Sequence, residues 1–197
     1  MINLEQFEQG MRLDQYMMGL ERNKENFRAN FLKATEFFAA EDMAFFRKLQ
    51  PKVNVVVLTD DENPDALRDV PIIGRLSVEV GSLKLKIFRR TNAAIADAIA
   101  HLNDGHVPIP AVLFFDQSMA LRGQFVQRLP ELSEEMLRRH AAWIEAHPEI
   151  RDVHEPVEKM TPITRTRFNQ VMYALAPDQR LFWGRKTVKA WREILES

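Results

Sequence analysis

Residues 53–66 read Val-Asn-Val-Val-Val-Leu-Thr-Asp-Asp-Glu-Asn-Pro-Asp-Ala, and this stretch decides how the rest of the chain is interpreted. Apart from Asn54, the run 53–58 is apolar and mostly β-branched, and breakers flank it, which predicts a strand buried on both faces of a sheet. Asn63 is a favourable residue just before a helix, and Pro64 suits the first helical position. The stretch therefore predicts a buried strand followed by a helix that begins at residue 64.

Strands and helices continue to alternate after this stretch. Residues 83–88 alternate Leu-Lys-Leu-Lys before Ile-Phe, which predicts a second, half-exposed strand. Thr91 or Asn92 can cap the next helix, which turn-forming residues end. The apolar runs 111–115 and 121–126 are joined by a short polar connection and predict a hairpin. This order predicts an α/β sheet with right-handed crossovers between parallel strands.

Helical patterns flank the predicted sheet on both sides. Apolar spacing over residues 4–49 predicts two or three helices before the first strand, and Pro71 is expected to kink the helix that contains it. Later helices are expected at about 130–147, 164–174 and 178–195. We therefore expect one compact domain made of an N-terminal helical extension (1–52), a core (53–147) and a C-terminal helical extension (148–197).

Composition excludes several classes of function. The 27 Lys and Arg residues balance 28 Asp and Glu residues, so the net charge of -1 gives no global field for nucleic acid or anionic lipid. The first ten residues lack the pattern of an export signal, and no apolar run approaches the roughly 20 residues needed to span a bilayer. We expect a cytoplasmic protein without a nucleic-acid or membrane partner.

The order of elements resembles the thioredoxin fold, a central mixed sheet of about four strands flanked by helices, here with extra helices at both ends. The local sequence resembles a bacterial thioredoxin-like family in which the first central strand runs into Thr-Glu-Asp-Trp-Cys. Residues 59–66 carry Glu62-Asn63 where that motif has Trp-Cys. The resemblance implies that Asn63 takes the attacking position and Ala66 the resolving one. It also implies that Pro71 is the helix-interior proline and that Ile109-Pro110 contains the cis-proline facing the active site.

The chain contains no cysteine. Disulfide exchange in this fold needs a thiolate at a helix N-terminus, where the dipole and free N–H groups lower its pKa. An amide cannot replace that thiolate, although asparagine caps a helix well. The resemblance therefore implies a preserved fold without its reaction. We assign no catalytic residue, cofactor or metal ligand, and the chain cannot be a thiol-disulfide oxidoreductase by its own residues.

Our leading hypothesis is a redox-inactive binding or interaction module. In this fold a cis-proline beside a helix N-terminus presents a backbone edge to which an extended peptide or a glutathione-like ligand can pair. We expect a protein, a peptide or a thiol-like small molecule as the partner, although Pro110 could also simply shape the turn into the next strand. The expected groove consists of Asp61, Glu62, Asn63, Pro64, Ala66, Ile109 and Pro110.

Two alternatives come from other classes of function. Four carboxylates, those of Asp60, Asp61, Glu62 and Asp65, gather at the end of the first strand and could bind a divalent cation or serve as acid and base in a non-thiol enzyme. Acidic residues also simply favour a helix start, and their spacing matches no fixed metal-binding loop. Alternatively, the extensions have a structural role, including homodimerisation. The apolar stripe through Leu181, Val188, Trp191 and Leu195 is expected to pack on the protein's own core or on a second subunit.

Overall fold

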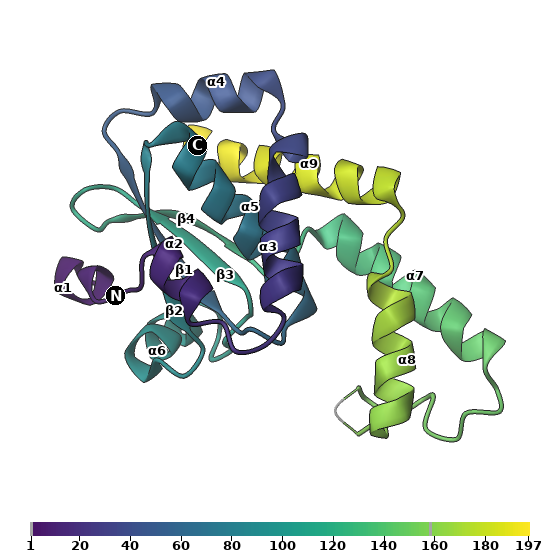
Figure 1. Cartoon of the computed structure of the whole chain (residues 1–197). Coiled ribbons are helices and arrows are strands. Elements are labelled where there is room, and N and C mark those ends of the chain that lie inside the picture. The colour runs from purple at the N-terminus through teal and green to yellow at the C-terminus, as the bar shows by residue number, and fades with distance from the viewer. Residues whose placement is uncertain (1, 158) are drawn as a thin grey trace. The chain divides into compact units, whose positions relative to one another are not determined.

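The structure, a computed structural model, describes residues 2–157 and 159–197 (Figure 1). The chain divides into two compact units, which we call the sheet unit (Met1–Gln127 with Gly184–Ser197) and the helical unit (Arg128–Trp183). The expected division at residues 52 and 147 stays a prediction. Among the described residues, no helix combines the length and the apolar character that crossing a membrane requires.

The sheet unit is built on four strands in the order β2-β1-β3-β4. Central strand β1 pairs in parallel with β2 and antiparallel with β3, and β3 pairs antiparallel with β4. All seven residues of β1 are buried, Asn54 and Thr59 among them, as the largely apolar run predicts. The mixed four-stranded sheet and the hairpin are therefore confirmed. The strand bounds are Val53–Thr59 (β1), Leu83–Arg89 (β2), Ala111–Phe115 (β3) and Leu121–Val126 (β4).

Side-chain caps start the two helices that follow the parallel strands. Asn63 Oδ1 accepts hydrogen bonds from the backbone N–H groups of Asp65 (2.9 Å) and Ala66 (3.0 Å), and α5 (Pro64–Val80) begins there. Asn92 caps α6 (Ala93–Leu102) in the same way. Helix α5 continues through the internal proline as one element. The Asn63 cap and the start of α5 were predictable because they follow from local chemistry, and Asn92 is one of the two residues predicted for the second cap.

The N-terminal extension contains more and shorter helices than expected. Its described part has four α-helices and a 3-10 turn, not two or three helices, because the first two have only five and six residues and are too short to show helical periodicity. The bounds are Leu4–Glu8 (α1), Leu13–Met18 (α2), Lys24–Lys33 (α3), Ala34–Phe37 (η1) and Ala40–Lys48 (α4). Helix α3 lies alongside α5 (Figure 1).

One residue of this extension adds to the sheet. Met11 exchanges two backbone hydrogen bonds of 2.9 Å with Ile87 in strand β2. Because an open strand edge invites pairing with another chain, this bridge covers part of the outer edge of β2.

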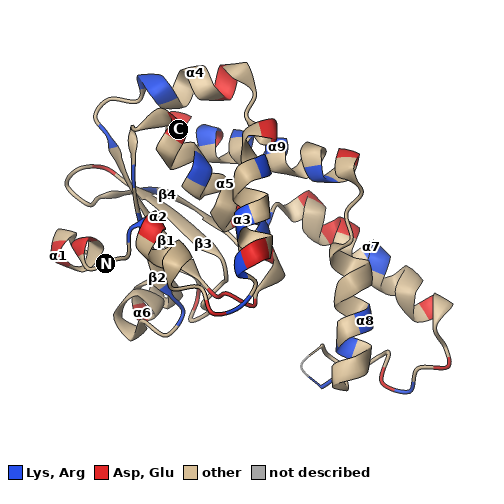
Figure 2. Ribbon diagram, viewed as in Figure 1, with Lys and Arg blue, Asp and Glu red and all other residues tan. Residues whose placement is uncertain are grey.

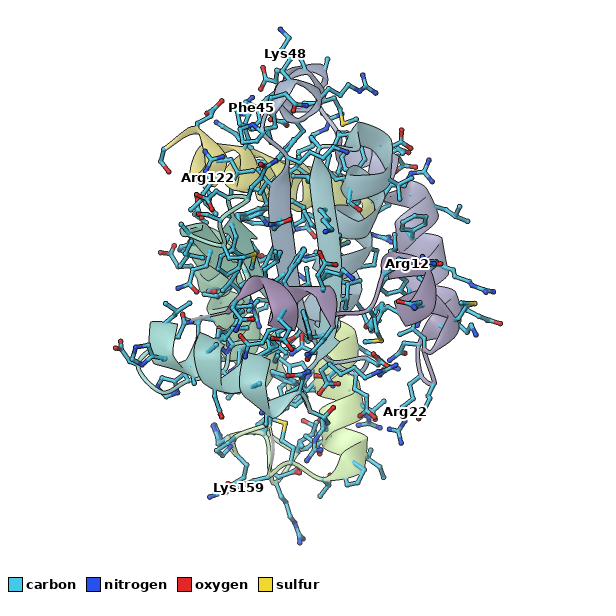
Figure 3. The ribbon with its side chains drawn as sticks, turned by 90° about the vertical axis from the view of Figure 1, so that its left-hand side faces the viewer. Arg12, Arg22, Phe45, Lys48, Arg122 and Lys159 are labelled. Carbon is cyan, nitrogen blue, oxygen red and sulfur yellow. The ribbon has the colours of Figure 1, made fainter. Side chains whose placement is uncertain are left out.

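Helix α9 (Pro177–Glu196) packs its C-terminal part on the sheet unit. Trp191 is fully buried, with its ring centroid 5.9 Å from that of Phe125 in β4. Gly123 of β4 permits this approach, since a Cβ there would lie only 2.6 Å from a methyl carbon of Ile194. Arg122 donates a hydrogen bond to the carbonyl of Leu195 and lies next to the yellow end of α9 (Figure 3). Val188, Trp191 and Leu195 of the predicted apolar stripe are therefore buried within the sheet unit.

The helical unit contains α7 (Pro130–Ala146) and α8 (Pro162–Tyr173), which pack against each other. Trp143 and Phe168 meet edge to face with ring centroids 5.4 Å apart, and His140 contacts the same Phe168 ring. The sequence predicts both helices. That α7 covers the sheet stays a prediction.

Candidate functional site

The carboxyl ends of β1 and β2 form the edge of the sheet at which the predicted site residues lie. Thr59 is paired with Arg89 in register, and the N–H of Arg90 donates to the Thr59 carbonyl at 2.8 Å. Strand β3 starts at the same edge, because Ala111 pairs with Leu58. This register puts Pro110 beside the end of β1, and the Ile109-Pro110 bond is cis, as the resemblance implies. Residues 61–66 and 109–110 therefore gather at one edge.

The side chain at position 63 acts as a helix cap. Asn63 is half-buried, and its amide oxygen binds the two N–H groups described above. Free N–H groups at a helix N-terminus are the groups that would stabilise a thiolate in this place. The asparagine thus satisfies the donors of the first helical turn and supplies no nucleophile.

The expected groove is more closed than the sequence suggests. Asp61, Ala66 and Ile109 are 8%, 2% and 6% exposed, and Pro110 is buried as well. Of the seven predicted residues, Glu62 is exposed, and Asn63 and Pro64 are half-buried. A ligand at this place would therefore meet few of the predicted side chains.

Asp61 is tied to segments on both sides of it. Its carboxylate accepts a hydrogen bond of 2.9 Å from the Tyr16 hydroxyl of α2 and forms an ion pair with Arg89. The Asn23 side chain donates to the Asp61 carbonyl at 3.0 Å, and Arg89 also donates to the Gly19 carbonyl at 2.6 Å. These contacts hold α2 and the loop after it against the junction between β1 and α5. We call this group of five residues, 16, 19, 23, 61 and 89, the Asp61 latch.

The latch changes the acid–base properties of its members. Burial raises the pKa of the Tyr16 hydroxyl well above its ordinary value, and the neighbouring Asp61 carboxylate raises it further. The hydrogen bond from Arg89 to Asp61 raises the pKa of the Arg89 guanidinium. Tyr16 is therefore a hydrogen-bond donor, and the Arg89 guanidinium stays protonated beside Asp61.

A second ion cluster lies in the first turns of α5. Arg68 pairs with both Asp65 and Asp69 at 2.7 Å, and both carboxylates are buried. Burial by itself lowers the pKa of Arg68, but the two carboxylates more than offset it, so that the pKa is raised. Asn30 of α3 donates to the carbonyl of Leu67 at 2.8 Å beside this cluster. Asp65 is thus part of an internal ion network.

The four acidic residues predicted as an alternative site have separate structural partners. Asp60 Oδ1 accepts a hydrogen bond from the Glu62 N–H at 2.9 Å, and Glu62 forms an ion pair with Arg22. Asp61 belongs to the latch and Asp65 to the Arg68 cluster. In the described part of the chain, no three His, Cys, Asp or Glu side chains are placed to hold a metal ion. Each of the four carboxylates therefore has a hydrogen-bond or ion-pair partner within the described part of the chain.

Among the described residues, two hollows open at this edge, and neither was predicted from the sequence. The strand-end pocket, about 260 Å³, is lined by residues 21–22, 59–62 and 89–91. The loop groove, about 700 Å³, is lined by residue 90, residues 102–108 and residues 126–127. Arg90 lines both. Figure 2 shows acidic and basic segments close together on the loops below the sheet, and Figure 3 shows Arg22 projecting at the periphery.

Comparison with solved structures supports the fold. A crystal structure of a protein of unknown function from Pseudomonas aeruginosa matches with a TM-score of 0.65 and 14% identity, covering 100% of this chain and 98% of that one. A crystal structure of an HIV epitope scaffold matches with a TM-score of 0.62 and 16% identity, covering 98% of this chain and 96% of that one. At these identities the likeness shows the fold alone.

Comparison with protein families identifies the family to which the chain belongs. No curated protein matches the sequence. A family model described as thioredoxin matches residues 10–146, which is more than half of the chain and includes the latch, α5 and the edge around Pro110. The chain therefore belongs to this thioredoxin family, with an asparagine cap where the resemblance places the attacking cysteine.

Proposed function

We propose that this protein is a redox-inactive thioredoxin-fold module that binds a protein partner through an extended peptide segment. The observation that carries the first half is the role of Asn63, whose amide oxygen caps α5 in a chain without any thiol. Disulfide exchange requires a thiolate, so the chain has no side chain that can perform it.

The loop groove is the surface that suits such a partner. Its lining comes from the loop that leads to Pro110 and from the end of β4, so it lies next to the edge around position 63. Its volume of about 700 Å³ lies within the usual range of ligand sites. Apolar side chains (Leu102, Val107) stand beside polar ones (Asn103, His106), a mixture that suits the side chains and backbone of a peptide.

A reductase assay tests the first half of the proposal. The wild-type protein is mixed with a disulfide-containing substrate and a dithiol, and reduction is compared with the uncatalysed rate. We expect the two rates to be equal. A rate above the background that increases with protein concentration would contradict the proposal.

A peptide-binding experiment tests the second half. Purified full-length protein is screened against a library of unstructured peptides, and the affinity of the best peptide is measured by fluorescence anisotropy. Val107→Asp, which adds a charge to the loop groove, should weaken binding by about tenfold or more. Val78→Asp makes the same change on an exposed part of α5 outside the groove and should have no effect. Absence of any binding peptide, or equal affinities for both variants, would contradict the proposal.

A further inference from the structure

We propose that the strand-end pocket binds a small zwitterion of the amino-acid class, with a preference for one that carries a second cationic group. This site is separate from the proposed peptide groove and shares only Arg90 with it.

The pocket lies where open α/β sheets commonly bind small molecules. It is formed outside the carboxyl ends of the adjacent parallel strands β1 and β2, and the chain goes from these ends into α5 and α6. Its volume of about 260 Å³ is room for several water molecules. That size suits a free amino acid better than a peptide segment.

The charges of the pocket fall into a paired set and an unpaired set. Arg22 and Glu62 form an ion pair at the rim, where both are well exposed, and Arg89 and Asp61 form one deeper inside. The pairs leave three charged lining residues: Glu21, Asp60 and Arg90. None of these three makes an ion pair with any residue that the structure describes, although the Glu21 carboxylate is near enough to Arg89 to contribute to its raised pKa. The pocket therefore offers one guanidinium and two carboxylates to a ligand.

These three groups match the two ends of an amino acid. A guanidinium binds a carboxylate through two parallel hydrogen bonds, so Arg90 is the site for the α-carboxylate. Asp60 uses Oδ1 to accept the Glu62 N–H, and Oδ2 is left for an ammonium group. Glu21 supplies a second carboxylate. Since two negative charges and one positive charge remain, a ligand with one carboxylate and two cationic groups balances the pocket, and L-lysine is such a ligand.

The floor of the pocket is fixed before any ligand arrives. Thr59 is fully buried, and the latch holds Asp61 and Arg89 through Tyr16 and Gly19. Because Arg89 already donates to Asp61 and to a backbone carbonyl, it does not compete with Arg90 for a carboxylate. A preorganised site loses less conformational entropy on binding, which favours recognition of a small ligand.

Isothermal titration calorimetry of the full-length protein at low salt tests the proposal with four probes. L-lysine should bind more tightly than L-alanine, and L-alanine more tightly than acetate or butylamine, each of which has only one of the two charges. Loss of one charged hydrogen bond should weaken lysine binding by about tenfold or more, so Arg90→Gln and Asp60→Asn should each do so. The asparagine in Asp60→Asn can still accept the Glu62 N–H, so the turn is kept.

Matched controls separate the pocket from general charge effects. Arg28→Gln and Asp97→Asn make the same changes on exposed residues of α3 and α6 outside the pocket and should leave lysine affinity unchanged. The proposal is overturned if millimolar lysine does not bind, if acetate or butylamine binds as tightly as lysine, or if the controls weaken binding as much as the pocket variants. Peptide binding in the loop groove is expected to survive Asp60→Asn, so failure of one proposal is distinguishable from failure of the other.

Discussion

The hydroxyl group of Tyr16 donates a hydrogen bond of 2.9 Å to Oδ1 of Asp61, a residue 45 positions further along the chain. Asp61 in turn forms an ion pair with Arg89 at the end of β2. One buried carboxylate thus joins the N-terminal extension, the junction before α5 and the second strand. The extension is a structural part of the candidate site and not an appendage to it.

Removal of the Tyr16 hydroxyl should weaken the latch measurably. Tyr16→Phe keeps the ring but leaves the buried Asp61 carboxylate with one donor fewer, so we expect the free energy of unfolding to fall by about 1–3 kcal/mol. Urea denaturation measures this change. A double-mutant cycle with Asp61→Asn should show a coupling of at least about 0.5 kcal/mol. Additive effects would mean that the two side chains do not interact.

The same hydroxyl predicts a loss of stability at alkaline pH. Burial first, and then the Asp61 carboxylate, raise the pKa of Tyr16 in the folded state above its ordinary value of 10.0. The unfolded chain therefore releases this proton at lower pH than the folded chain does. The stabilising contribution is complete below the ordinary pKa and is lost progressively as the pH rises above it. Between pH values just below and above 10, the wild type should lose more stability than Tyr16→Phe does. Parallel pH dependences would contradict this account.

Substitution of Arg68 should destabilise the folded state more than substitution of most other polar residues of α5. Arg68→Met removes the guanidinium from two buried carboxylates, and breaking a buried ion cluster in this way typically costs about 3–5 kcal/mol. Arg75→Met is the matched control, because Arg75 pairs with Glu79 on a partly exposed face of the same helix. This substitution should lower the free energy of unfolding by at most about 1 kcal/mol. Thermal or urea unfolding of both variants decides between these values.

The cap at position 63 should contribute to stability by itself. Asn63→Ala deletes the acceptor of two backbone N–H groups and should lower the free energy of unfolding by about 1 kcal/mol. Asn63→Ser and Asn63→Asp keep an oxygen that can cap, so both should stay close to the wild type. If the Asn63→Ala variant unfolded with the same free energy as the Asn63→Ser variant, the result would show that no cap forms at this position.

The elements that depend on neighbouring residues were predictable from the sequence. The largely apolar, β-branched run of β1 predicts a buried central strand, and Asn63 with Pro64 predicts the start of α5. The short helices α1 and α2 were not predicted, because a helix of five or six residues is too short to show helical periodicity in its sequence.

The candidate site was less predictable, because its geometry depends on distant partners. The sequence places Asp61 in an acidic cluster, but Tyr16 and Arg89, which determine its role, lie 45 and 28 positions away. The sequence similarly suggests that Asp65 could bind a ligand, whereas in the structure it is buried in an ion pair with Arg68. The two hollows consist of loops that only the register of β1, β2 and β3 brings together.

Position 63 is decisive, because the proposed function takes it as the place from which a thiol has been lost. The direct measurement is the disulfide reductase activity of the Asn63→Cys, Ala66→Cys double variant beside the wild type and the single variant Asn63→Cys. The backbone N–H groups that now bind the Asn63 oxygen would then stabilise a thiolate, so we expect the double variant to reduce disulfides repeatedly with a dithiol as reductant. The wild type should stay at the background. A correctly folded double variant that is as inactive as the wild type would contradict the account.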